Sequence, residues 1–146
     1  MMAGKPRVRW YGKEAVKVVQ EAGMKALRTG GEKVLTEAIK AAPVDTGTLR
    51  RSGTVTVGKL PEFERVYESA KAGNDMGKAF PGETGNEKAV YVSFSTPYAL
   101  RQHEELDYHH PRGGGPKYLE TPHRQLEGKV KHMAEAAIKK ALRETK

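Results

Sequence analysis

Residues 45–47, Asp-Thr-Gly, have the sequence of the short signature of aspartic peptidases. Those enzymes place two such carboxylates together so that they share a proton, each on a rigid loop after an apolar strand. Here the triplet occurs once, follows Pro43, and precedes Arg50 and Arg51, which would place cations beside the dyad. We therefore interpret the triplet as a turn in which Asp45 or Thr46 caps a short second helix.

A second group of potential ligands lies between His103 and His110. Its members are His103, Glu104, Glu105, Asp107, His109 and His110. Imidazoles and carboxylates can hold zinc or a harder metal. The spacing is not that of the His-Glu-x-x-His helix, and adjacent histidines point to different sides of any regular element. We expect polar packing and hydrogen bonds near a loop, with a metal site as the alternative, and we assign no metal ligand.

No other arrangement of residues suggests catalysis. The chain has no cysteine, which excludes a thiol nucleophile and a cysteine-ligated zinc. Residues 113–117, Gly-Gly-Gly-Pro-Lys, lack the spacing and the Lys-Ser/Thr ending of a phosphate-binding loop. We interpret this stretch as a flexible connector. The expectation is a protein that is not an enzyme and that needs no cofactor.

The charge of the chain points to partners. The formal net charge is +8, and most of the excess lies in the two parts that look helical, before residue 52 and after residue 118. Arg7 and Arg9 stand beside Trp10 and Tyr11 in an N-terminal arm, residues 1–12, that could stack on single-stranded nucleic acid. A basic nucleic-acid-binding module is therefore the alternative function. The candidate partner contacts are Arg7, Arg9, Arg50 and Arg51.

Two long helices are predicted from apolar side chains that recur every three or four residues. The first spans residues 13–42 and must end before Pro43. Gly30-Gly31 is expected to kink or split it, because glycine is a poor helix former. The last spans residues 118–143, with Leu126, Val130, Met133 and Ala137 expected to face a sheet. Both are long for one domain of 146 residues, which favours an oligomer or a partner surface.

Between the helices, residues 54–57 and 88–95 alternate as strands do. Further strands are expected near Phe63–Tyr67 and Trp10, and residues 71–87 are expected to form a long flexible loop. The predicted fold is a single α+β domain, residues 1–146. It has a long N-terminal helix, a short second helix, a small antiparallel sheet, and a long C-terminal helix packed on the sheet. No apolar run approaches the roughly 18 residues of a membrane span, so we expect no membrane partner.

Three segments carry a resemblance to a known family. Residues 41–52, Ala-Ala-Pro-Val-Asp-Thr-Gly-Thr-Leu-Arg-Arg-Ser, resemble the A-P-V-D-T-G-x-L-R-x-S segment of tail-completion and minor capsid proteins of tailed phages. Residues 96–99, Thr-Pro-Tyr-Ala, with His103-Glu104 after them, are a second match. Residues 117–122, Lys-Tyr-Leu-Glu-Thr-Pro, are a third. The residues of the resulting signature turn are Pro43, Asp45, Thr46, Gly47 and Leu49.

The resemblance implies a structural protein of the phage neck, with neither catalysis nor a cofactor. Proteins of this family form a ring, commonly sixfold, at the head–tail interface. The implied partners are further copies of the chain and other neck and tail proteins. Genome DNA would pass through the ring without specific binding. The implied location is the head–tail junction of the virion, and the host cytoplasm before assembly.

Overall fold

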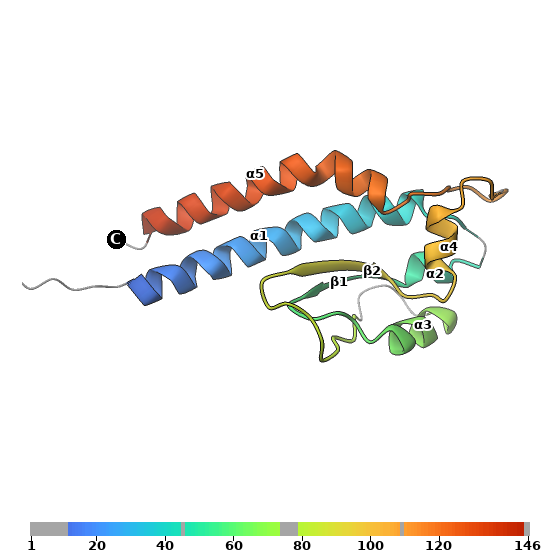
Figure 1. The fold of residues 1–146 in the computed structure, drawn as a ribbon, viewed down its shortest axis with the longest axis horizontal. Coiled ribbons are helices and arrows are strands. Elements are labelled where there is room, and N and C mark those ends of the chain that lie inside the picture. Colours follow the sequence, from blue (N-terminus) through green and yellow to red (C-terminus); the bar gives the residue numbers. More distant parts are fainter. Residues whose placement is uncertain (1–11, 45, 74–78, 109, 145–146) are drawn as a thin grey trace, which may run out of the picture.

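The computed structural model describes residues 12–44, 46–73, 79–108 and 110–144 (Figure 1). The fold is α+β, as the sequence predicts. Its elements are α1 (Gly12–Ala41), α2 (Thr48–Arg51), β1 (Gly53–Val57), α3 (Phe63–Lys71), β2 (Val90–Phe94), α4 (Ala99–Glu104) and α5 (Glu120–Glu144).

The frame of the molecule is the pair formed by α1 and α5, which lie side by side (Figure 1). The 30 residues of α1 span about 45 Å. At Gly30 the two helices come so close that a β-carbon there would lie 2.5 Å from Val130 Cγ1. Gly23 faces Ile138 in the same way, so the helices run antiparallel. The expectation that Gly30-Gly31 splits α1 is wrong, because these glycines serve close packing inside a continuous helix.

The apolar stripe of α5 faces α1 rather than the sheet, so that prediction is also wrong. Leu126, Val130, Met133 and Ala137 are all half-buried, along a helix that packs on α1. The sheet packs on α1 as well, from another side. α1, the longest helix among the described residues, is therefore the element on which both α5 and the sheet pack.

The sheet has two antiparallel strands, β1 and β2, with Gly53 opposite Phe94 and Val57 opposite Val90. Its valine face meets α1 at Gly31. A β-carbon on Gly31 would lie 3.1 Å from a methyl group of Val90 and 3.3 Å from one of Val55. The glycine therefore sets how closely the sheet approaches the helix.

The strand expected near Phe63–Tyr67 is instead the start of α3, so that prediction is wrong. Val66 and Ala70, four residues apart, are both buried, which is the spacing of a helix. An ion pair between Arg65 and Glu62 (3.2 Å) lies in its first turn. The strand expected near Trp10 lies outside the described residues.

The segment expected as a flexible loop, residues 71–87, begins within α3, which ends at Lys71. Its described part, residues 79–87, runs beside residues 58–62. The amide of Leu60 donates to the Thr84 carbonyl oxygen (2.8 Å), and that of Glu62 donates to the Phe80 carbonyl oxygen (2.7 Å). Residues 74–78 lie outside the described part, and flexibility of this loop stays a prediction. Within the described ranges, no helix is long and apolar enough to cross a membrane.

Candidate functional site

The three segments that carry the resemblance meet in space. Four buried residues form one hydrophobic cluster, and they are Ala42, Leu49, Ala99 and Tyr118. The first two belong to residues 41–52, Ala99 belongs to residues 96–99, and Tyr118 belongs to residues 117–122. Phe94, at the end of β2, packs its ring edge-on against Tyr118 at 5.1 Å. The motifs therefore form the core at one end of the molecule, which we call the signature end.

Arg50 holds the C-terminus of α1. Its Nε and Nη2 donate to the Ala42 carbonyl oxygen (3.0 and 2.8 Å), and Nη2 also donates to that of Lys40 (3.0 Å). The last carbonyls of a helix lack partners within it and carry partial negative charge, so a guanidinium there is stabilising.

Arg51 makes a comparable link to α3. Its Nε donates to the Ala70 carbonyl oxygen (2.9 Å) and its Nη1 to that of Thr46 (3.3 Å). Arg50 and Arg51 are both half-buried. Their contact with a partner stays a prediction, and Arg7 and Arg9 lie outside the described residues.

The turn before α2 is set by Gly47, which has a left-handed φ of 84°. A β-carbon there would also lie 2.7 Å from Arg51 Nη1. The Thr46 hydroxyl lies 2.8 Å from the Thr48 hydroxyl and accepts a long hydrogen bond from the Thr48 amide (3.4 Å). Thr46 thus contributes to the helix start, one residue earlier than the N-cap position. Pro43 and Leu49 are buried, while Asp45 lies outside the described residues.

The triple glycine is part of the signature end rather than a free connector. Gly115 donates to the Ala41 carbonyl oxygen (3.0 Å), and Gly113 accepts from the Val44 amide (3.2 Å). A β-carbon on Gly114, whose φ is 79°, would lie 2.3 Å from the Ala42 carbonyl oxygen. The stretch is glycine-rich because its backbone crosses the end of α1 at contact distance.

His103 is fixed by hydrogen bonds at both ring nitrogens. Its Nδ1 lies 2.8 Å from Glu104 Oε1, and its Nε2 accepts from the Glu120 amide (3.2 Å). Glu104 also pairs with Lys117, and Glu120 with Arg124 (2.7 Å). The described residues contain no group of three or more potential metal ligands, and His109 lies outside them. The part of the His103–His110 group nearest α5 therefore makes the polar contacts expected near a loop.

Two titratable groups of this end have shifted pKa values with clear causes. The hydrogen bond from Lys117, followed by that from His103, lowers the pKa of Glu104 below its ordinary value. Burial, with a smaller contribution from Tyr98, raises the pKa of Tyr118. The Tyr118 phenol therefore stays protonated and donates to the Ala99 carbonyl oxygen (2.7 Å).

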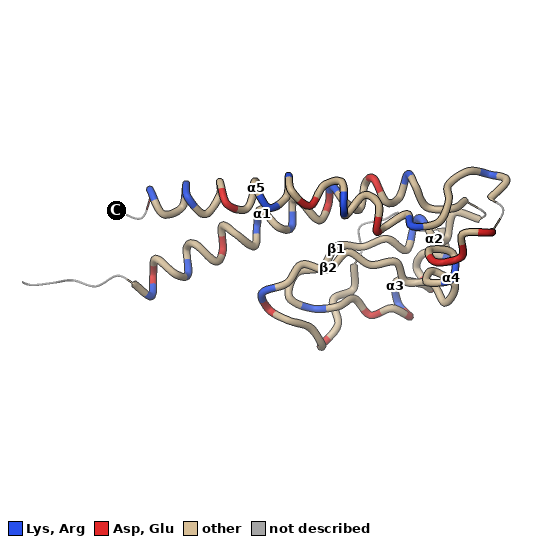
Figure 2. The backbone as a smooth tube through the Cα atoms, turned by 45° about the horizontal axis from the view of Figure 1, so that its top comes forward, with Lys and Arg blue, Asp and Glu red and all other residues tan. Residues whose placement is uncertain are grey.

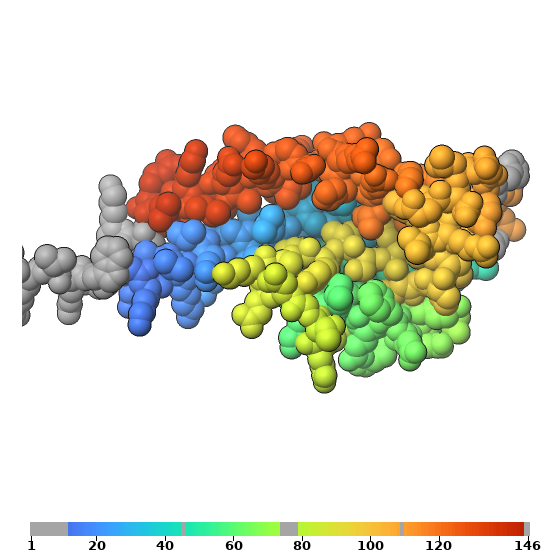
Figure 3. Space-filling view, in the orientation of Figure 1, coloured from blue at the N-terminus to red at the C-terminus, as the bar shows by residue number. Residues whose placement is uncertain are grey.

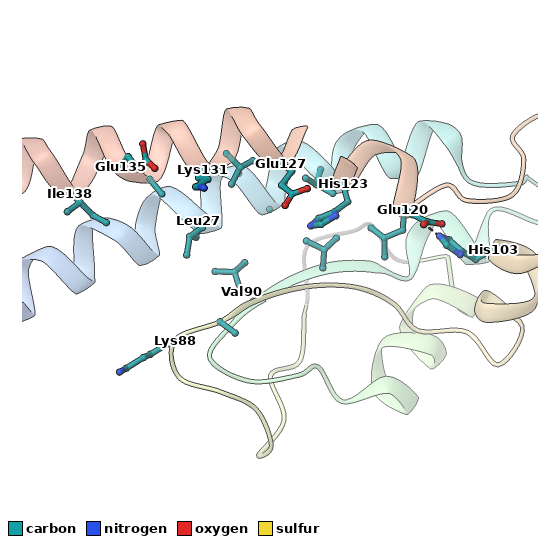
Figure 4. Close-up of a pocket in the computed structure, with 18 residues that line it drawn as sticks. Leu27, Lys88, Val90, His103, Glu120, His123, Glu127, Lys131, Glu135 and Ile138 are labelled. Atoms are coloured by element: carbon teal, nitrogen blue, oxygen red, sulfur yellow. Dashed lines mark hydrogen bonds between the residues drawn. The ribbon is translucent and has the colours of Figure 1, made fainter. Parts of the chain in front are cut away.

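A groove with a volume of about 910 Å³ runs along α1 and reaches the signature end at His103 and Leu119. Figure 3 shows it as a hollow between α5 and the β2 region, with α1 as its floor. Most of its apolar lining comes from these three elements, and the full set comprises Leu27, Gly30, Gly31, Val34, Ala89, Val90, Val92, Leu119, Val130, Ala134 and Ile138. Glu127 and Lys131 reach toward it from α5, and Lys88 lies at its other rim (Figure 4).

This lining is mostly aliphatic, and its titratable members do not form a nucleophile–base pair. His103 is held by its own hydrogen bonds, and Glu120 is held by cations. Such a groove binds an apolar surface, which is how protein segments dock.

A comparison with family models supplies the relationship. The HK97-gp10-like model, whose description is bacteriophage HK97-gp10, tail component, matches residues 7–95, more than half of the chain. The chain belongs to this family. It is a structural tail component of a phage particle, as its resemblance implied. A search of curated proteins and a search of solved structures found no match.

For this tail component, sequence reasoning found the signature turn but missed two features. It missed that Arg50 and Arg51, both in α2, donate to backbone carbonyls of other segments, because the sequence does not show which helix end each side chain reaches. It also missed the groove. The valines of residues 88–95 were recognised as a strand, but the sequence does not show that α5 lies over α1 and leaves β2 uncovered.

Proposed function

We propose that this tail component is a structural protein of the phage neck that joins head and tail by forming a ring at their interface. The match to a family of phage tail components over residues 7–95 carries the proposal. The partners are further copies of the chain and adjoining neck and tail proteins. The position is the head–tail junction of the virion, reached by assembly in the host cytoplasm.

The shape of the monomer supports assembly into an oligomer. The N-terminal part of α1 and the C-terminal part of α5 extend together beyond the sheet. The sheet and the short helices lie along the remaining part of this helix pair (Figure 1). Large apolar side chains stay exposed at separate places, including Val16 (56%), Leu100 (74%) and Leu106 (68%). A lone exposed leucine is ordinary, but together with an apolar groove these side chains indicate several partner surfaces. We propose a closed ring, with six copies as the expected number.

The distribution of charge supports a ring that lets DNA pass without holding it. Figure 2 shows Lys and Arg interspersed with Asp and Glu along α1 and α5. Each phosphate that a protein neutralises strengthens DNA binding and steepens its salt dependence. A surface of mixed charge therefore favours the passage of DNA over tight DNA binding. The excess charge of +8 is available for docking to acidic neighbouring proteins.

The test is to remove the protein from a phage that encodes it. A nonsense mutation in its gene, with a plasmid-borne copy as the complementing control, should give DNA-filled heads and separate complete tails in negative-stain microscopy. Normal virions from the uncomplemented mutant would contradict a required role. Heads without any tails in the lysate would place the protein in tail assembly rather than in joining.

A DNA-binding measurement on the purified protein separates the neck role from nucleic-acid binding. The purified protein should show weak DNA binding without sequence preference that disappears at physiological salt. Tight binding to DNA that persists at that salt would favour the basic nucleic-acid-binding module instead.

A further inference from the structure

The groove has an open wall, which is the outer edge of β2. The Gly58 amide donates to the Ala89 carbonyl oxygen (2.8 Å), so the alternation of an antiparallel pair turns the backbone groups of Tyr91 and Ser93 toward β1. The backbone groups of Val90, Val92 and Phe94 then point to the outer edge. Among the described residues no strand pairs with this edge.

A two-stranded sheet with a free edge beside an apolar groove has room for a further strand. Two strands alone are marginally stable, and a third strand or a covering element is needed. α1 covers one face of this sheet at Gly31, while the edge stays open beneath α5 (Figure 4). A strand added there would gain backbone hydrogen bonds from β2 and bury alternate side chains in the groove.

The chain itself contains a segment of that pattern. Residues 7–11, Arg-Val-Arg-Trp-Tyr, alternate basic and apolar side chains, so a strand would place Val8 and Trp10 on one face and Arg7 and Arg9 on the other. The family match begins at residue 7 and so includes this segment. Trp10 is the only tryptophan of the chain, and tryptophan is the residue type most often found as an interface anchor.

The length of the connection decides which groove this segment reaches. Ile138 lines the end of the groove nearest Gly12 and faces Gly23, which lies 11 residues after Gly12, so the helix separates that end from Gly12 by about 16 Å. Trp10 is two residues before Gly12 and can extend at most roughly 7 Å from it. Trp10 therefore cannot fill the groove of its own chain, whereas it can enter that of a neighbouring copy.

Charge favours the same occupant. Glu120 is already paired with Lys117 and Arg124, so the remaining charges of the lining are balanced, with Glu127 and Glu135 against Lys88 and Lys131, in a chain of net charge +8. Glu127 points into the groove and forms no ion pair with another described residue (Figure 4). The arginines of an entering segment would find their complement there.

We propose that residues 7–11 of one copy add as a third strand to the free edge of β2 in the next copy and fill its groove beneath α5. Val8 and Trp10 lie against α1 and β2, and Arg9 faces Glu127. Each copy gives its segment to one neighbour and receives one from the other, which is a head-to-tail contact that closes into a ring. The inference relies on the proposed function only for the existence of an oligomer.

Cross-linking tests the contact directly, because the chain has no cysteine of its own. Val8→Cys and a size-tagged Val90→Cys protein are co-expressed and treated with a short bis-maleimide. A hybrid dimer band is expected, both in the purified oligomer and in assembled particles. The control replaces Val90→Cys with Phe63→Cys, an exposed position (49%) on α3, and should give no hybrid band.

The outcomes separate this contact from the role in the neck. Lack of the hybrid dimer in both preparations, or an intramolecular cross-link in a Val8→Cys/Val90→Cys double variant, overturns the proposal and leaves the head–tail role to its own test. A hybrid dimer in particles whose protein lies away from the neck would support the contact and overturn the role.

Substitutions at the contact between residues 7–11 and the groove show how much each side chain contributes to the stability of the oligomer. Trp10→Ala should raise the concentration at which the oligomer dissociates at least tenfold, as for an interface anchor. Its melting temperature as a monomer should not change, because the residue precedes α1. Arg9→Glu and Glu127→Lys should each weaken the oligomer, and the double variant should recover most of the loss. Equal dissociation of the Trp10→Ala variant and the wild type would overturn the assignment of Trp10.

Discussion

The signature end and the groove side of this molecule are built in opposite ways. At the signature end, Arg50, Gly115 and Tyr118 donate hydrogen bonds to backbone carbonyls of the same chain, and the cluster around Leu49 is closed. On the groove side, the apolar faces of α1, β2 and α5 surround an unfilled volume of about 910 Å³. The difference indicates that the family signature stabilises the monomer, and it supports our proposal that assembly takes place on the groove side.

The largest effect on stability is expected at the signature end. Leu49 is 5% exposed, and Leu49→Ala should lower the free energy of unfolding by about 2–5 kcal/mol, because it leaves a cavity among Ala42, Ala99 and Tyr118. Denaturant titration measures it. Leu100→Ala, at a position 74% exposed, is the control and should change stability by less than about 0.5 kcal/mol. Equal effects of the two would contradict a closed core there.

The contact between the long helices is expected to come next. Gly30→Ala places a methyl group where Val130 now lies and should destabilise by about 1–3 kcal/mol. Gly128→Ala adds the same methyl group on α5 where no atom lies within 4 Å. That variant should be stabilising by roughly 0.5–1 kcal/mol, because alanine is the better helix former. Changes of the same sign would mean that α5 does not pack on α1 at Gly30.

Arg50 should matter to the monomer through its hydrogen bonds. Arg50→Ala removes the donors to the Ala42 and Lys40 carbonyl oxygens and should cost about 1–3 kcal/mol, since the carbonyl of the buried Ala42 loses a charged donor. Thermal melting of Arg50→Ala measures this loss of stability, with Arg28→Ala as the control variant. Arg28 makes one exposed ion pair with Glu32 (3.6 Å), so its loss should be nearly neutral. A stable Arg50→Ala protein with defective particles would favour partner contact over helix capping.

The smallest effect is expected at Tyr118. Tyr118→Phe removes the hydrogen bond to the Ala99 carbonyl oxygen and should cost about 0.5–1.5 kcal/mol at neutral pH.

The same substitution should change how stability depends on pH. The pKa of Tyr118 is raised in the folded state above the ordinary 10.0, so its contribution is complete below pH 10 and declines as the pH rises further. The wild type should therefore lose stability above pH 10 more steeply than Tyr118→Phe, as measured by urea titration across that range. Parallel curves would show that the phenol is not buried.

The sequence predicted those elements whose residues repeat with a clear period. α1, α5 and both strands were found from periodicity, and the end of α1 from Pro43. α3 was missed because β-branched and aromatic residues near Phe63–Tyr67 suggested a strand, while the helical pair Val66 and Ala70 was decided by tertiary burial.

The candidate site was predicted in part, for a similar reason. The signature turn is a local sequence motif and could be recognised from its residues alone. The roles of Gly30 and Gly114 depend on which backbone or side chain crosses them, which a single sequence does not contain. The groove could not be predicted at all from the sequence, because it results from the placement of α5 relative to β2.

Amide hydrogen exchange, measured on the free protein and on the assembled particle, tests most directly that assembly uses the groove side. The account predicts that the amides of Val92 and Phe94 exchange fast in the free protein and become protected on assembly. Amides of α2 and of residues 113–115, at the signature end, should keep the same protection in both states. Unchanged exchange along β2, with new protection at the signature end alone, would contradict it.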